Sequence, residues 1–288
     1  MVALLETGRT LIAGMLLAVA LICGTGATAS AADDLYRAQT AVTGQLEPNR
    51  LIGFAACLED VLIKVSGAPT LAGDRRLEPY KAKAKEFVTS FDYHDQFAGK
   101  PHRDEQGTRD RPYDLTVAFD AKKIDGILAA LGLKPWQVHR PVLGVFIEMR
   151  QGAKDYVVTS DGAQSDLQRD ALAAAASKRG MRFVLPSEAA LAQRNITGAE
   201  LWKAPSATLT SIAAPQGGLV VLVGQLVWDD NDLGWVTQWQ MDWHGKSHRW
   251  QFRGVTFDEA FRRGIGGAAQ VLSGNGAPVS NPTNARRQ

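Results

Sequence analysis

The chain has 288 residues, of which 45% are hydrophobic and 22% are charged, so it can bury a sizeable core and wholesale disorder is excluded. The length is enough for one large domain or two modest ones. The formal net charge is only +2, and the basic residues occur as isolated pairs, which argues against a nucleic-acid-binding protein.

The N-terminal segment has the pattern of a secretory signal. An uncharged apolar run over residues 11–23 follows Arg9 and leads to small residues with an Ala-x-Ala pattern at Ala29 and Ala31. We therefore expect cleavage after Ala31, which makes 1–31 a signal peptide and places the protein in the periplasm. The run is short for a bilayer span, so we expect no integral membrane segment after signal removal; retention as an anchor is the alternative.

The two cysteines do not predict a disulfide. Cys23 belongs to the predicted signal, and because it follows Ile22 rather than a small residue, a lipoprotein is not indicated. Cys57 is then alone in the mature chain and cannot form an internal bridge. We expect Cys57 to be a small buried hydrophobe, with a reactive thiol as the alternative.

Residues 32–135 predict an N-terminal α+β module. A strand over 34–43 precedes a helix that has Pro48 near its start and Gly67 just past its end. Apolar residues within this helix recur at a spacing of three to four, which predicts one buried stripe. A second helix is expected over 75–85. The remaining elements expected in this module are a strand over 87–93, a strand over 113–120 and a helix that ends at Gly132.

Residues 139–274 predict a C-terminal α/β module, which follows a linker over 134–141. The apolar run 141–149 is typical of a central strand covered on both faces. A hairpin partner, an Ala-rich helix over 165–178 and short helices should come next. Three strands then form an antiparallel β-meander, and Thr256 with Glu259 predicts the capping box of a closing helix. Residues 275–288 have the composition of a disordered tail.

The predicted fold class is therefore α+β (α/β). We expect two small α/β sandwich modules, the second with its antiparallel β-meander packed against helices.

The strand WVTQWQMDW carries a tryptophan stripe. Trp235, Trp239 and Trp243 share one face, whereas glutamines occupy the other, so the glutamine side should be wet. A row of exposed indoles would make a large apolar patch, which soluble proteins avoid unless it is functional. We expect the stripe to be core beneath the closing helix, in which Gly264 and its neighbouring glycines permit close packing. An exposed platform for sugar rings or peptide is the alternative.

Polar loops supply the candidate contact residues for a partner or ligand. One set follows the first meander strand, one flanks the next turn, and one lies in the charged loop 100–111. The residues in these three sets are Trp228, Asp229, Asp230 and Asp232; His244 and His248; and His102 and Arg103. The chain has no Gly-x-Ser-x-Gly elbow and no phosphate-binding Gly-rich loop, so we predict no catalytic residue, cofactor site or metal site.

Three segments resemble the bacterial exported family called domain of unknown function 2066. They are LEDVLIKVSGAP after an apolar helix, the strand RPVLGVFIEM preceded by a Trp, and an ending of the form W…W…H-x-W…G-x-TFDEAF. The resemblance spans roughly residues 34 to 273 and implies an exported α/β protein. It implies no established activity, so no functional residue is carried over. The order of elements in the second module is also similar to envelope accessory domains, including the N-terminal domain of the Tol-system periplasmic protein, which bind partners.

These observations predict an exported, non-catalytic protein that acts by binding in the cell envelope. The expected partner is an envelope protein or a glycan, without a cofactor. Two alternatives come from other classes of protein. One is a glycan or peptidoglycan binder with exposed tryptophans, and the other is a periplasmic metal-dependent hydrolase built on His94, His102 and Asp95.

Overall fold

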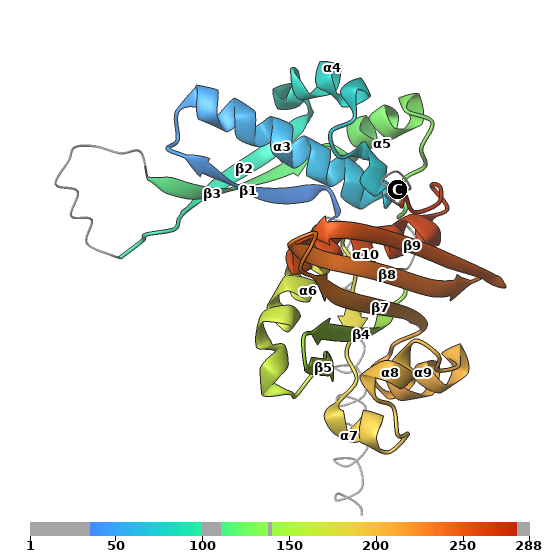
Figure 1. Ribbon diagram of the computed structural model, residues 1–288. Helices are drawn as coiled ribbons and strands as arrows, with labels where there is room; N and C mark the ends of the chain where they lie inside the picture. The colour runs from blue at the N-terminus through green and yellow to red at the C-terminus, as the bar shows by residue number, and fades with distance from the viewer. Residues whose placement is uncertain (1–34, 100–110, 138–139, 281–288) are drawn as a thin grey trace, which may run out of the picture.

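The computed structural model describes residues 35–99, 111–137 and 140–280, which form two modules (Figure 1). The predicted signal peptide lies outside the described residues, as do His102 and Arg103. Among the residues that the structure describes, no helix is long and apolar enough to cross a membrane.

The N-terminal module is a three-stranded antiparallel sheet with helices on one face (Figure 1). The strand order is β1-β3-β2, so β1 and β2 are the edges. The principal elements are β1 (Arg37–Thr43), α3 (Glu47–Ser66), β2 (Val88–Asp95), β3 (Pro112–Phe119) and α5 (Ala121–Ala130). Alternate residues of β1 and β3 are buried against α3, which accounts for the predicted stripe on that helix.

Helix α3 begins and ends as its sequence predicts. Pro48 lies in the first turn, and Gly67 adopts the left-handed conformation with φ of 67° while its N–H donates to the carbonyl of Ile63. The helix expected over 75–85 is instead broken into three pieces: a 3₁₀ turn (Arg75–Leu77), α4 (Glu78–Lys81) and a second 3₁₀ turn (Ala84–Phe87). Pro79 explains part of this difference, since proline fits only the first turn of a helix.

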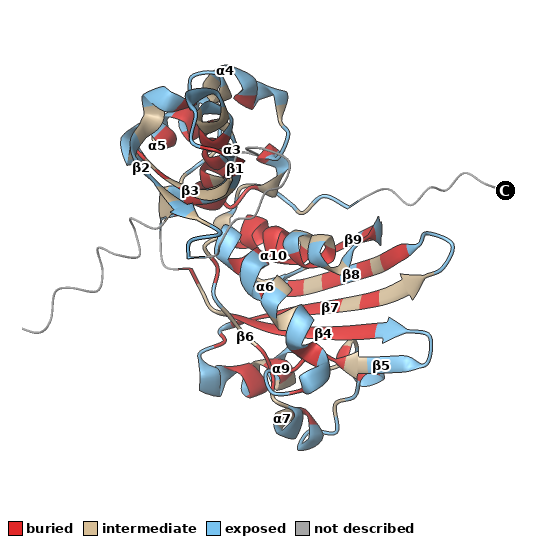
Figure 2. Ribbon diagram, turned by 90° about the vertical axis from the view of Figure 1, so that its left-hand side faces the viewer, coloured by how far each residue is buried: buried red, intermediate tan, exposed pale blue. Residues whose placement is uncertain are grey.

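The C-terminal module is a six-stranded mixed sheet with helices on both faces (Figure 2). The order is β5-β4-β7-β8-β9, and the short β6 also pairs with β4. Strands β4 and β7 are parallel, whereas β7, β8 and β9 form the predicted antiparallel meander. The strands are β4 (Leu143–Gln151), β5 (Lys154–Val157), β6 (Phe183–Val184), β7 (Val220–Asp229), β8 (Gly234–Trp243) and β9 (Lys246–Val255).

The helices of this module divide between two core layers. Helices α6 (Asp166–Lys178) and α10 (Phe257–Ser273) cover one face of the sheet. Helices α7 (Glu188–Ala192), α8 (Gly198–Leu201) and α9 (Ser206–Ala213) cover β4 and β7 on the other face. The outer face of β8 and β9 is left uncovered, which agrees with the alternating glutamines there. The whole chain is thus α+β, as predicted.

The tryptophan stripe is core. Trp239 is fully buried, and Trp235 and Trp250 are only 8% and 2% exposed. The indole of Trp239 is held between Gly224 of β7 and Gly264 of α10, where an added Cβ would lie 2.5 Å from a ring atom in both cases. The predicted cap also forms, because the Thr256 side chain accepts from the Glu259 N–H. Trp243, at the end of β8, is only partly buried, so the prediction of a buried stripe beneath a closely packed α10 is confirmed for Trp235 and Trp239.

Gly264→Ala should lower the free energy of unfolding by about 1–3 kcal/mol, because the new methyl group overpacks Trp239. Gly126→Ala in α5 is the matched control, since it places a methyl group in open space on another helix. The control should be neutral or stabilising by up to about 1 kcal/mol through helix propensity. Urea unfolding followed by far-UV circular dichroism gives both values. Equal stabilisation by the two substitutions would contradict the close packing.

Candidate functional site

The junction between the modules is built on the C-terminal turn of α3. The last carbonyls of a helix have no partner within it and must be satisfied elsewhere when they are buried. Here the second module and the linker supply the donors. The Arg140 guanidinium donates to the Lys64 carbonyl at 2.8 Å, the Trp136 N–H donates to the Val65 carbonyl at 2.7 Å, and the Asn275 side chain donates to the Ser66 carbonyl at 2.7 Å.

Arg140 also contacts the end of α6. Its guanidinium donates to the carbonyl of Arg179 at 2.6 Å and to that of Trp136 at 3.0 Å, and it lies 4.2 Å from the Trp136 ring centroid. The side chain is 9% exposed. Burial lowers the pKa of Arg140 to about 10, and Tyr36 partly opposes this effect. A cation is favourable at this position because the negative ends of two helix dipoles meet there.

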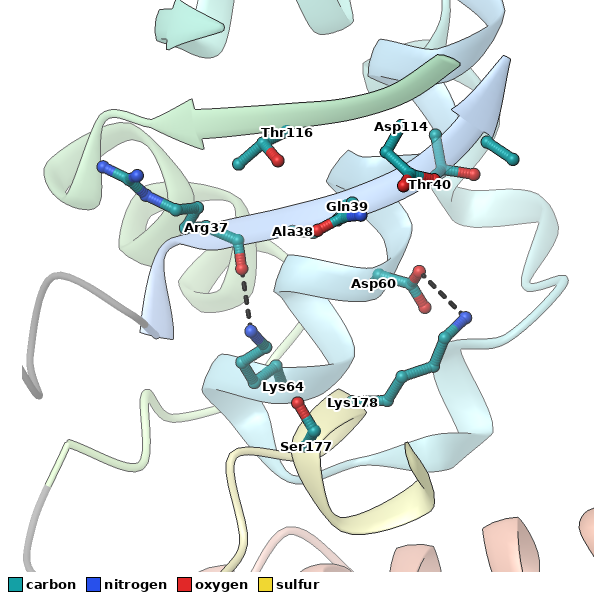
Figure 3. Close-up of a pocket in the computed structure, with 11 residues that line it drawn as sticks. Arg37, Ala38, Gln39, Thr40, Asp60, Lys64, Asp114, Thr116, Ser177 and Lys178 are labelled. Carbon is teal, nitrogen blue, oxygen red and sulfur yellow. Dashed lines mark hydrogen bonds and ion pairs between the residues drawn. The ribbon is translucent and has the colours of Figure 1, made fainter. Parts of the chain in front are cut away.

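A groove of about 490 Å³ opens beside this junction (Figure 3). Strands β1 and β3 form one wall, and α3 and the end of α6 form the other. The residues that line it are Arg37, Ala38, Gln39, Thr40, Ala41, Asp60, Lys64, Asp114, Thr116, Ser177 and Lys178.

The backbone of β1 faces this groove along its free edge. Strand β1 pairs only with β3, through even-numbered residues: the Tyr36 carbonyl accepts from Phe119, and the Gly44 N–H donates to Arg111. Odd-numbered residues must then point their N–H and C=O groups outward. Side chains of α3 satisfy the two ends of this edge, because Lys64 donates to the Arg37 carbonyl at 2.7 Å and Asn49 donates to the Thr43 carbonyl.

Gln39 and Ala41 form the open middle of the edge. Both residues are exposed, and both line the groove. By the same alternation, each presents an outward N–H donor and an outward C=O acceptor. Such a row is a template for an additional strand.

Both acidic side chains that line the groove have a partner within the protein. Lys178 lies 3.6 Å from Asp60, and Gln96 donates to Asp114 at 2.7 Å (Figure 3 shows the first pair). Arg37 projects at the start of β1. The groove is lined by arginine, lysine, aspartate, serine and threonine side chains, which can bind a ligand through charge and hydrogen bonds.

The acidic turn after β7 is satisfied by its own contacts. The indole N–H of Trp228 donates to Asp230 at 2.9 Å, and the ring packs edge-to-face on Trp235. Asp229 accepts from the Asn231 N–H, and the backbone contacts lower the pKa of Asp229. Arg253 bonds Asp229 and Asp232 at 3.1 and 2.9 Å. The three aspartates of the turn therefore already have partners within the turn, on β7 or on β9.

The three described histidines, His94, His244 and His248, do not form a shared metal site. His244 occupies the β8–β9 turn with φ of 48° and packs on Trp243, whereas His248 pairs with Met241 across the sheet. His94 and Asp95 point to opposite faces because they are adjacent in β2. Asp95 is instead bonded by the Phe97 N–H and by Arg111, and these contacts lower its pKa. Within the described part of the chain, no three His, Cys, Asp or Glu side chains could share a metal ion.

Cys57 is inaccessible. The residue is fully buried in the core of the first module, and burial raises the pKa of its thiol to about 12. A thiolate is the reactive form of cysteine, so this environment makes the group inert. The prediction of a small buried hydrophobe is confirmed.

Residues 29–137 match the model of a family described as Domain of unknown function (DUF8605). The match covers the first module and stops before the second. It corrects the resemblance to domain of unknown function 2066, because a different family model matches the chain. No curated protein matches the chain, and no solved structure matches it.

Sequence analysis did not find the groove. Its residues come from four elements that are distant in the chain, and only the observed packing of α6 against α3 brings them together. The signal that could have been used is the alternation of β1, in which polar or small residues Arg37, Gln39, Ala41 and Thr43 share one side.

Arg140→Met should lower the free energy of unfolding by about 2–4 kcal/mol, since three buried carbonyls lose a donor. The midpoints from tryptophan fluorescence and from circular dichroism should also separate, because six of the seven tryptophans follow Arg140 and the modules lose a shared bond network. Arg150→Met, at an exposed position, is the control and should change stability by less than about 0.5 kcal/mol. Coincident midpoints and unchanged stability in Arg140→Met would refute the role of this residue at the junction.

Proposed function

We propose that this chain is an exported, non-catalytic accessory protein of the cell envelope that holds an extended peptide segment of a partner protein. The segment adds as a strand to the free edge of β1, within the groove between the modules. The observation that carries the proposal is the pair of outward-facing residues Gln39 and Ala41 in a groove walled by α3 and α6.

Main-chain recognition fits the chemistry of this groove. An added strand would pair with the N–H and C=O of both residues, which gives affinity without demanding one sequence. The charges at the two ends then set preference: Arg37 favours an acidic side chain near the start of β1, and Asp114 favours a basic one farther along. The occupant we propose is therefore an extended segment with one acidic and one basic residue.

The buried tryptophans of the meander do not support the glycan alternative. Trp235, Trp239 and Trp250 are buried, so they offer no stacking platform. The hydrolase alternative depended on His94, Asp95 and His102; the first two diverge, and the third lies outside the described residues. A peptide-binding role at β1 requires neither the tryptophans nor this group of two histidines and an aspartate.

The export step has its own test. When the full chain is expressed in a Gram-negative host, mass spectrometry of the periplasmic fraction should find an N-terminus at Ala32. The matched variant carries Ala29→Leu and Ala31→Leu, which remove the small residues that the signal peptidase needs, and it should accumulate unprocessed. An unprocessed wild-type chain that stays in the cytoplasm would disprove this localisation.

Ala41→Pro should weaken strand addition while leaving the fold intact. Proline removes the outward N–H of Ala41, which β1 does not use for pairing with β3, and proline is tolerated on edge strands. The probe is a fluorescein-labelled seven-residue peptide of alternating Thr and Val with one Glu and one Lys, followed by fluorescence anisotropy. Binding should weaken at least about tenfold, the cost of one main-chain hydrogen bond.

Ala41→Val is the control, because it keeps the N–H and suits a strand. Two further peptides carry N-methyl groups on alternate amides, one at the odd positions and one at the even positions. The peptide whose N-methyl groups point away from β1 should bind, and the other should not. Circular dichroism establishes that all variants are folded. Equal affinity of the Pro and Val variants, or equal affinity of both methylated peptides, would exclude recognition through the β1 backbone.

A further inference from the structure

A second pocket, of about 520 Å³, lies beside α10 and β9. It is formed where the first module, β9, α10 and the C-terminal segment meet. The residues that line it are Pro69, Thr70, Ala72, Arg179, Trp250, Phe252, Glu259, Arg262, Arg263, Gly267, Gln270, Pro278 and Val279. Aromatic and aliphatic groups form its walls, and arginines lie among them.

Three buried polar atoms of this lining have no hydrogen-bond partner. They are the indole Nε1 of Trp250, the Oε1 of Gln270 and the Nη1 of Arg179. Trp250 and Gln270 are only 2% and 3% exposed. The Trp250 Nε1 lies against Gly267 of α10, where an added Cβ would be 2.7 Å from it. An unsatisfied buried polar atom costs free energy, so the Gln270 and Arg179 atoms point to a group that satisfies them when it binds.

The charges of the pocket favour an anion. Glu259 is already engaged by Arg262 and Arg263, each with a contact of 2.6 Å. Arg263 also lies over the Phe252 ring, 4.6 Å from its centroid. The third arginine of the pocket is Arg179. Burial lowers the pKa of its guanidinium because the group is removed from water. Three arginines therefore face one glutamate.

We propose that this pocket binds a small organic monoanion with an apolar body, such as an aromatic or aliphatic carboxylate. The anionic group accepts from the Arg179 guanidinium. The apolar body lies against Phe252 and Pro69, where its burial supplies the remaining affinity. A hydroxyl or amide N–H on the ligand would donate to Gln270.

The C-terminal segment closes one side of the site. Pro278 and Val279 line the pocket, and the Ser280 hydroxyl accepts from the Gln251 N–H at the free edge of β9. Asn275 anchors the beginning of this segment at the module junction. The wall is thus held at both ends by polar contacts.

The test uses the full folded chain and a probe of this chemistry, anilinonaphthalene sulfonate, whose fluorescence rises on binding. The wild type should bind the dye with a Kd of about 10–100 µM, as expected for a ligand of that size. Benzoate, phenylacetate and octanoate should displace it, whereas the uncharged amides of the same acids should not.

Two variants and a control locate the site. Arg179→Gln should weaken dye binding about tenfold by removing the cation, and Val279→Glu should do the same by adding a negative charge to an exposed wall residue that folding does not need. Arg194→Gln, an exposed arginine on the far side of the second module, should leave binding unchanged. Ala41→Pro should also leave it unchanged, so failure here and failure of the peptide-binding proposal are distinguishable. Undiminished dye binding in both pocket variants, displacement by the neutral amides, or no saturable binding in the wild type would overturn the proposal.

Discussion

The fold depends on how the buried C-terminus of α3 is satisfied. Its last three carbonyls would be orphaned in a nonpolar setting, and each receives a donor from Arg140, Trp136 or Asn275. These donors come from the linker and from the segment after α10, so the end of α3 is capped by residues that lie 76 and 209 positions farther along the chain. Arg140 completes the arrangement because its guanidinium also reaches the end of α6. One buried cation without a carboxylate partner is stabilised here by carbonyl dipoles of two helices and by the Trp136 ring.

This capping fixes the relative position of α3 and α6, and the groove follows from it. Lys178 reaches Asp60 only because the end of α6 lies beside α3. The side chains of α3 then satisfy both ends of the free edge of β1 and leave its middle open. An exposed strand edge is an aggregation hazard unless it is short or blocked. Here the unblocked length is confined to Gln39 and Ala41, which is enough for a few main-chain bonds with a bound segment and too little for indefinite stacking.

Features set by contiguous sequence could be predicted, whereas features set by contacts between distant segments could not. Local periodicity identified α3, the meander and the buried tryptophan face, because alternation and three-to-four spacing are properties of contiguous sequence. It failed over 75–85, where Pro79 and turn geometry outweighed an apparently helical composition. It named the acidic turn after β7 as a candidate contact surface but gave no sign that Arg253 of β9 pairs with Asp229 and Asp232 there. Both pockets escaped prediction because each is assembled from elements far apart in the chain, and a single sequence carries no signal for their meeting.

The end of α6 takes part in both candidate sites. Ser177 and Lys178 line the groove beside β1, whereas the side chain of the next residue, Arg179, lines the pocket beneath the C-terminal segment. The carbonyl of Arg179 meanwhile accepts from Arg140 at the junction. Three consecutive residues therefore contribute to the groove beside β1, to the pocket beside α10 and to the module interface. The backbone of Arg179 is thus held at the junction by Arg140, while its side chain lies in the lining of the pocket.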